Sequence, residues 1–136
     1  MLALETRLFI DGKFVAGQGP SEIAFEPATG ETLAEVASAS PAQVDAALLA
    51  AERALARWRL TTPRERSRIL LAIAERIEAS AAGLAEVESR NAGKPRRFVQ
   101  GGELANVADV FRFFGTAVRN MPGTAAADYR ASGMTS

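Results

Sequence analysis

Two polar residues, Glu103 and Asn106, stand three positions apart in a segment whose apolar residues repeat with a helical period. At this spacing both side chains project from the same side of a helix. A carboxylate beside an amide could recognise a cationic group. Together with Asp109, however, the pair could mark a solvent-exposed polar stripe, and the spacing by itself favours that second interpretation.

Three basic residues, Lys94, Arg96 and Arg97, precede the same predicted helix. Cations at a helix N-terminus face an unfavourable dipole, so each is expected to have a partner of opposite charge. A cofactor phosphate is one candidate for that partner. We expect Glu103 or a neighbouring surface to supply it instead.

Two glycine pairs could in principle bind a phosphate. The Gly-Gln-Gly run at 17–19 contains the first two glycines of a dinucleotide fingerprint, but Glu22 occupies the position of the third. No helix start follows it, so we interpret it as a flexible surface loop. The pair Gly101 and Gly102 lies near the start of a helix, where it would loosen the first turn or allow close packing.

The chain of 136 residues contains no cysteine and no histidine. The first absence excludes a thiol nucleophile, a disulfide and a thiolate metal site. The second removes the usual general base near neutral pH and the commonest metal ligand. Catalysis by residues of this chain alone is therefore not expected.

Net charge and hydropathy limit the classes of partner that the chain is expected to bind. Lys and Arg together number 16, as do Asp and Glu, so the formal net charge is zero. Steering of nucleic acid or of an anionic membrane requires a charge excess. No apolar run approaches the length of a membrane span, and the first residues do not resemble a signal peptide. These observations predict a cytoplasmic protein that binds neither nucleic acid nor membrane.

The first forty residues are predicted to form a small β-structure. Residues 7–15 have the pattern of a short hairpin, with Asp11 and Gly12 supplying the positive φ angles of a two-residue turn. A turn is predicted over 25–30, where Pro27 fixes φ and Gly30 permits left-handed geometry. Residues 31–39 alternate imperfectly and are predicted to form an edge strand.

Four helices are predicted to follow. Ser40 and Thr62 each begin a capping box with proline at the first helical position. Ser80 is predicted to cap a third helix, which Gly93 and Pro95 end. A fourth helix is predicted to continue to the Met-Pro-Gly sequence at 121–123. The residues predicted to face inward are Val44, Leu48, Ala51, Leu55 and Trp58, then Ile69, Leu70, Ile73 and Ile77, then Leu84 and Val87, then Leu104, Val107, Phe111, Phe114 and Val118.

Two aromatic features stand out from these stripes. Trp58 is predicted to close the first helix against the core. Three rings, Phe111, Phe113 and Phe114, are too many for one stripe. Either two surfaces are covered, or the third ring requires a partner outside this chain.

Many short segments, in order and in register, resemble aldehyde dehydrogenases. They include the hairpin over 8–13, the Pro-Ala-Thr-Gly-Glu turn over 27–31, Gly-Lys-Pro over 93–95 and Phe-Arg-Phe-Phe-Gly over 111–115. The stretches 88–91 and 109–114 look most like bacterial γ-aminobutyraldehyde dehydrogenases, with betaine-aldehyde dehydrogenases close behind. The resemblance extends over about residues 8–136.

This resemblance implies an α/β fold, in which a β-hairpin and an edge strand precede four helices. Residues 1–122 would be the N-terminal part of the Rossmann-like cofactor domain of an aldehyde dehydrogenase. Residues 123–136 would begin the oligomerisation arm and its strand. The complete enzyme would be a homo-oligomer, dimeric or tetrameric.

The activity implied is oxidation of an aldehyde, such as the aminoaldehyde 4-aminobutanal, to the carboxylic acid with NAD or NADP. The family's cysteine nucleophile, its glutamate base and its cofactor-binding strands would all lie beyond Ser136. No catalytic or cofactor-binding residue is therefore assigned to this chain, and the isolated chain is expected to be inactive. The alternative is a free-standing, non-catalytic helical module that uses the same N-terminal segment for binding or assembly.

Two further sites are implied by the resemblance alone. Glu103 and Asn106 match positions that face the substrate funnel, where aminoaldehyde enzymes tend to place acids. The side chain of Asn91 and the backbone carbonyl of Phe25 match ligands of a monovalent cation. Many relatives have Asp at the position of Asn91, and the loss of that charge would weaken the cation site.

Overall fold

The computed structural model describes residues 4–120, beginning with a short hairpin of β1 (Leu8–Ile10) and β2 (Lys13–Val15). The two strands are antiparallel, with Ile10 opposite Lys13. Asp11 has φ 52° and Gly12 has φ 76°, the positive angles that a tight two-residue hairpin turn requires. The predicted hairpin and its turn are confirmed.

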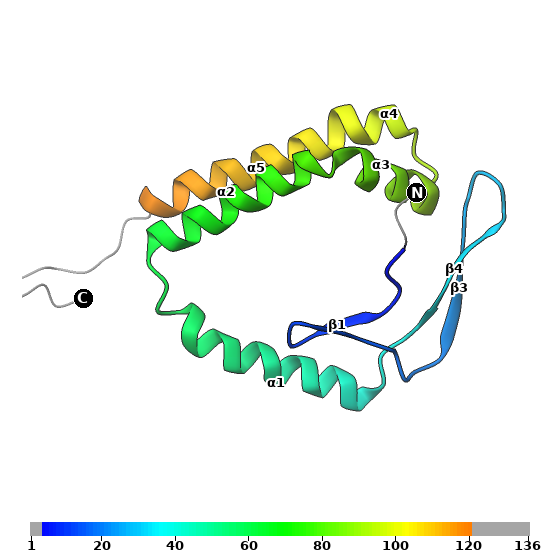
Figure 1. Cartoon of the computed structure of the whole chain (residues 1–136), viewed down its shortest axis with the longest axis horizontal. Coiled ribbons are helices and arrows are strands. Elements are labelled where there is room, and N and C mark those ends of the chain that lie inside the picture. The colour runs from blue at the N-terminus through cyan, green and yellow to red at the C-terminus, as the bar shows by residue number, and fades with distance from the viewer. Residues whose placement is uncertain (1–3, 121–136) are drawn as a thin grey trace, which may run out of the picture.

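A second antiparallel pair, β3 (Ser21–Phe25) and β4 (Thr32–Ala37), forms a long ribbon beside the helices (Figure 1). The predicted edge strand is confirmed as β4, and Gly30 in the turn has φ 73°. Strand β3 was not predicted, because its residues lie between two turn-rich segments and are nearly all exposed. The pairing register also shifts between Ala24 and Phe25.

The glycines at 17 and 19 pack closely against the end of β4, which corrects the prediction of a flexible loop. A Cβ atom at Gly17 would lie 2.2 Å from the carbonyl oxygen of Ala37, and one at Gly19 would lie 2.9 Å from that of Ala39. The backbone N–H of Gly19 donates to the carbonyl of Ser38 at 2.8 Å. Only glycine allows this approach, so the segment is a packing junction.

Helices α1 (Pro41–Trp58) and α2 (Pro63–Ala79) both begin with the predicted capping box. The hydroxyls of Ser40 and Thr62 each accept a hydrogen bond from the N–H three residues later, at 3.3 Å in both cases. Helix α3 (Ala81–Ala92) ends at Gly93, whose φ of 71° is left-handed as predicted. Ser80 is the N-cap residue of α3 as predicted, but its side chain makes no capping hydrogen bond.

The predicted fourth helix begins earlier than expected and contains a wider turn. It consists of α4 (Arg96–Phe98), a π-helical segment η1 (Val99–Glu103), α5 (Leu104–Ala117) and a 3-10 turn η2 (Val118–Asn120). The wide turn coincides with Gly101 and Gly102, and π turns of this kind are frequent at functional sites. The predicted stop at 121–123 and the arm at 123–136 lie outside the described residues.

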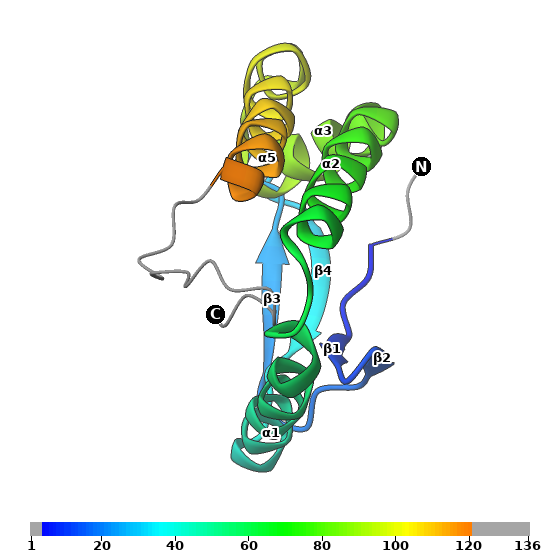
Figure 2. The same ribbon diagram turned by 90° about the vertical axis from the view of Figure 1, so that its left-hand side faces the viewer.

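Among residues 4–120 the most extensive contact is that between α2 and α5, which run antiparallel and side by side in two views (Figures 1 and 2). Four small residues are buried there, two on each helix at a spacing of seven: Ser67, Ala74, Ala108 and Gly115. A Cβ atom at Gly115 would lie 3.1 Å from Cδ2 of Leu71. Small side chains therefore allow the two helices to approach closely.

This close approach explains why the large apolar residues of the fourth helix are less buried than predicted. Phe114 is 57% exposed, and Val107 is also exposed, because small residues occupy the contact and the larger ones lie at its margins. Other residues predicted to face inward that are exposed in the described part of the chain are Val44, Leu48, Ala51, Leu55, Trp58, Ile69 and Leu84.

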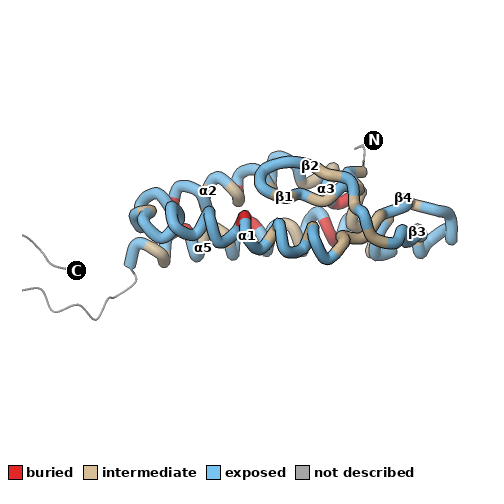
Figure 3. The backbone as a smooth tube through the Cα atoms, turned by 90° about the horizontal axis from the view of Figure 1, so that it is seen from below, coloured by how far each residue is buried: buried red, intermediate tan, exposed pale blue. Residues whose placement is uncertain are grey.

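Helix α1 lies apart from the pair of α2 and α5 (Figure 1). Ala50 is its one buried residue, and the burial colouring shows α1 mostly exposed (Figure 3). Trp58 was predicted to close α1 against the core, but its side chain is 44% exposed. The guanidinium of Arg66 lies over its ring at 5.5 Å instead.

Within residues 4–120, no helix is both long enough and apolar enough to cross a membrane.

Candidate functional site

Glu103 is the last residue of η1, and Asn106 follows in the first turn of α5. Both line a shallow groove of about 450 Å³, whose other walls are the apolar side chains Val107, Val110 and Phe111. The two polar residues therefore share one face, as their spacing predicted. The groove combines one carboxylate and one amide with an apolar wall, which suits a short alkyl chain that ends in a cation.

The carboxylate of Glu103 is bound by Lys94, the partner that the sequence predicted for this lysine. Lys94 Nζ lies 3.0 Å from Oε2 of Glu103 and 3.0 Å from Oε1 of Glu88. The hydrogen bond to Glu88, followed by that to Glu103, raises the pKa of Lys94 above its ordinary value. The ammonium is therefore protonated throughout the neutral range and bridges two carboxylates.

The segment that presents Lys94 has a defined backbone. Gly93 ends α3 in the left-handed conformation, and the hydroxyl of Ser89 donates to the carbonyl oxygen of Lys94 at 2.6 Å. Arg96, which the sequence grouped with Lys94, instead pairs with Glu86 at 2.8 Å. The participation of Glu88 was not predicted, because nothing in its spacing from Lys94 reveals that the chain reverses at Gly93.

A second groove, of about 510 Å³, adjoins the first and shares Glu103 and Val107 with it. Its lining is mostly apolar, with Leu84 and Val99 among its residues, and also includes Glu5. Hydrogen bonds from the side chain and backbone of Arg7 lower the pKa of Glu5 to about 2. Glu103 therefore lines both grooves.

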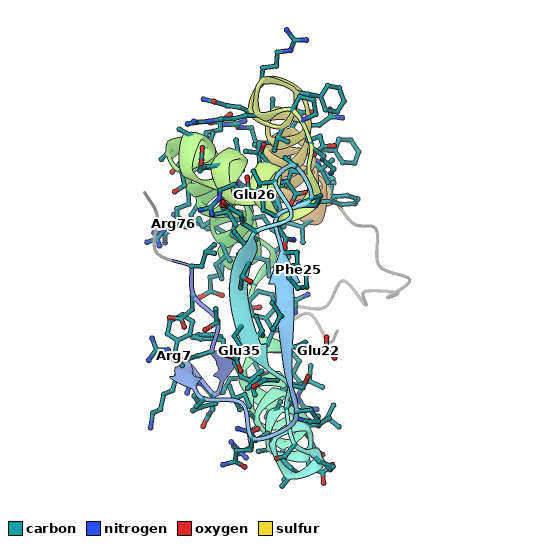
Figure 4. The ribbon with its side chains drawn as sticks, turned by 90° about the vertical axis from the view of Figure 1, so that its right-hand side faces the viewer. Arg7, Glu22, Phe25, Glu26, Glu35 and Arg76 are labelled. Atoms are coloured by element: carbon teal, nitrogen blue, oxygen red, sulfur yellow. The ribbon has the colours of Figure 1, made fainter. Side chains whose placement is uncertain are left out.

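The two residues assigned to a monovalent cation lie on segments that the structure brings together. Gly93, close after Asn91, contacts Pro27, which follows Phe25 by two residues. Figure 4 shows Phe25 and Glu26 at the end of β3 that lies away from α1. Arg90 pairs with Glu26 at 3.1 Å, so a positive charge already lies in this region.

The two expected ligands are an amide side chain and a backbone carbonyl, which are oxygen donors of the kind that a hard cation takes. Within residues 4–120 no group of three Asp, Glu, His or Cys residues could hold a metal ion. Asn91 and Phe25 are both exposed. The cation site stays a prediction.

The aromatic rings at 113 and 114 form a separate exposed feature. Phe113 and Phe114 contact each other edge to face, with ring centroids 5.3 Å apart. Both are mostly exposed, whereas Phe111 is half-buried and lines the first groove. The three rings therefore serve two different surfaces.

Comparison with known proteins gives consistent matches. A family model described as the aldehyde dehydrogenase family matches residues 14–135. An aldehyde dehydrogenase of Vibrio cholerae serotype O1 is 42% identical over 99 residues, covering 73% of this chain and 20% of that protein. A probable aldehyde dehydrogenase of Mycobacterium bovis is 36% identical over 131 residues, covering 90% of this chain and 25% of that protein.

A solved structure, that of PnpE in complex with nicotinamide adenine dinucleotide, matches with a TM-score of 0.85 and 35% sequence identity. The match covers 93% of this chain and 26% of PnpE, which confirms the predicted α/β fold class. The chain spans about a fifth to a quarter of the length of the relatives that it matches.

Proposed function

Because the chain belongs to the aldehyde dehydrogenase family, we propose that it forms the substrate-facing N-terminal region of an enzyme that oxidises an aminoaldehyde, such as 4-aminobutanal, to the carboxylic acid with NAD or NADP. In this proposal the enzyme is a cytoplasmic homo-oligomer. Residues 1–122 belong to its cofactor domain, and residues 123–136 begin its oligomerisation arm. Asn91 and the carbonyl of Phe25 hold a monovalent cation.

The observation that supports the aminoaldehyde is the groove of Glu103 and Asn106. Its apolar wall of Val107, Val110 and Phe111 suits the methylene chain of such a substrate. The carboxylate of Glu103 suits the distal ammonium, since a hydrogen bond to a charged group is among the stronger contacts a partly desolvated groove offers. The aldehyde end would then extend toward the reacting atoms.

Chemistry itself is assigned to residues outside this chain, because the sequence has no cysteine and no histidine. The glycines at 17 and 19, which match part of a dinucleotide fingerprint, pack against the end of β4 and the residues after it. NAD or NADP, bound elsewhere in the enzyme, would accept the hydride. The role of this chain is to bind and orient the substrate.

The substrate assignment is tested by Glu103→Gln in the enzyme that contains this chain. We expect kcat/KM for 4-aminobutanal to fall about tenfold to a hundredfold, because a charged hydrogen bond is lost. Butanal has the same four-carbon chain and no ammonium, so its kcat/KM should change little. Asp109→Asn, on the same helix but outside the groove, is the matched control. Equal falls for both substrates, or no fall for either, would refute the aminoaldehyde.

The 136-residue chain by itself tests the proposal that catalysis and cofactor binding belong to residues outside it. Calorimetric titration with NAD should detect no binding, and no aldehyde should be oxidised. Saturable binding of NAD in the micromolar range would contradict the proposal that the cofactor site lies elsewhere.

A further inference from the structure

The Glu103 carboxylate of the proposed substrate groove already has a cation bound to it. Lys94 Nζ is equidistant from Glu103 and Glu88, at 3.0 Å from an oxygen of each. One ammonium therefore serves two carboxylates, and the three groups together have a net charge of −1. An ammonium that enters the groove meets a carboxylate whose charge is partly neutralised.

The bridge joins three separate elements. Glu88 lies in α3, Lys94 in the connection after it, and Glu103 at the end of the π turn η1. The Lys94 backbone is held by the bond from Ser89 to its carbonyl oxygen at 2.6 Å. Glu103, which lines the groove beside Asn106 and Val107, is thus paired with a cation whose backbone is held in place.

Resting on the proposed function, we propose that Lys94 is a specificity-determining residue: it holds Glu103 at the groove and competes with the substrate ammonium for that carboxylate. Lys94 thereby sets how strongly the groove prefers a cationic aldehyde over a neutral one. Glu88 is the alternative partner, which retains Lys94 when Glu103 binds the substrate.

The competition predicts that removing Lys94 increases the preference for the cationic aldehyde. General damage to the enzyme would not produce such an increase. In Lys94→Met the aliphatic stem is kept and the charge is removed, so Glu103 offers its full charge to the substrate. We expect the ratio of kcat/KM for 4-aminobutanal to that for butanal to rise about three- to tenfold, mainly through KM. Lys94→Arg, which keeps the charge, should stay close to the unmodified enzyme.

Glu88→Gln should have the opposite effect. It removes the alternative partner, so Lys94 pairs with Glu103 alone and the ratio should fall by a similar factor. Arg96→Met is the matched control, because Arg96 belongs to the same connection but pairs with Glu86, which does not line the groove. That variant should leave the ratio unchanged.

A second measurement does not depend on turnover. The Kd of n-butylammonium, measured by calorimetry on the same enzyme, should tighten about three- to tenfold in Lys94→Met, and this gain should vanish in the double variant Lys94→Met/Glu103→Gln. If Lys94→Met lowers both substrates equally, leaves the ratio unchanged, or keeps its gain in the double variant, the role of Lys94 is overturned. If Glu103→Gln alone leaves the ratio unchanged, the proposed function itself fails.

Discussion

The two halves of the described chain are packed very differently. In the α2–α5 region, which comprises α2, α3, η1 and α5, burial extends over every element and includes Ser67, Ala74, Ala85, Val99, Ala108 and Gly115. In the α1–ribbon region, which comprises β1 to β4 and α1, the one buried residue is Ala50. Figure 3 shows the same contrast.

Both regions nevertheless begin their first helix in the same way, with a capping box and a proline at the first helical position. A cap satisfies the free N–H groups of a first turn, and so it determines where a helix begins. It does not determine what the helix packs against. In α2 small residues at a spacing of seven provide that contact, whereas the apolar stripe of α1 stays exposed.

The largest expected effect follows from overpacking the α2–α5 contact. Ala74 is 0% exposed, so Ala74→Leu should lower the free energy of unfolding of the 136-residue chain by about 3 kcal/mol. The same substitution at the exposed Ala46 of α1 is the matched control, and it should change stability by less than about 0.5 kcal/mol. Urea unfolding followed by circular dichroism measures both. Equal losses would remove the distinction between the regions.

The exposed stripe of α1 should cause the 136-residue chain to self-associate. Leu48 is 64% exposed and Leu55 is also exposed, one above the other at a spacing of seven. We expect Leu48→Gln/Leu55→Gln to weaken association at least about tenfold, because apolar burial is lost. Sedimentation at several concentrations measures it.

The control for this experiment is Ala46→Gln/Arg57→Gln, on the opposite side of α1, which should leave association unchanged. A monodisperse, unmodified chain with a sharp two-state melt would instead support the free-standing module.

The two caps should differ in their effect on the whole chain. Thr62→Ala should lower global stability by about 1 kcal/mol, because α2 is part of the packed region. Ser40→Ala should reduce helix content, seen by circular dichroism, with a smaller shift of the urea midpoint. Thr62→Ser and Ser40→Thr keep the capping oxygen and should restore both quantities. A larger midpoint shift for Ser40→Ala would show that α1 is part of the cooperative unit.

The smallest effect concerns the ion pair of Glu78 and Arg112, which joins α2 to α5. The hydrogen bond from Arg112 lowers the pKa of Glu78 below its ordinary value of 4.5. A depressed carboxyl pKa contributes stability that is present above pH 4.5 and lost as the pH falls through the folded-state pKa. Glu78→Gln should therefore be less stable than the unmodified chain at pH 7, and this difference should diminish below pH 4.5.

Arg112→Met should show the same pH dependence in urea unfolding, since it removes the other member of the pair. The variant that combines both substitutions should lose no further stability at pH 7 if the pair acts as a unit. A difference for Glu78→Gln that persists unchanged to pH 3 would exclude a contribution from the charge.

Local rules predicted the elements whose signals lie within a few residues. The positive-φ pair Asp11 and Gly12 determines the hairpin turn, and the boxes at Ser40 and Thr62 determine two helix starts. Strand β3 was not predicted, because this segment forms a strand only by pairing with β4. The π turn at Gly101 escaped because glycine permits a wide turn without requiring one.

In the candidate site, too, features with local signals were predicted and features that depend on distant contacts were not. The shared face of Glu103 and Asn106, and the pairing of Glu103 with Lys94, follow from helical spacing and the charge of a helix start. The ion pair of Lys94 with Glu88 was not predicted, because it depends on how the chain turns at Gly93. The burial of α5 was mispredicted because apolar periodicity counts large residues, whereas Ala108 and Gly115 make the contact.

The side chain of Gln43 links two distant parts of the chain through one atom. Its Oε1 accepts from the N–H of Ser40 at 3.1 Å and from the N–H of Gln18 at 2.9 Å, while its Nε2 donates to the carbonyl of Ala16 at 2.8 Å. In hydrogen exchange, the Gln18 and Ser40 amides therefore depend on the same opening event. The first turn of α1 and the connection between β2 and β3 should therefore gain and lose protection together, as one unit of local unfolding.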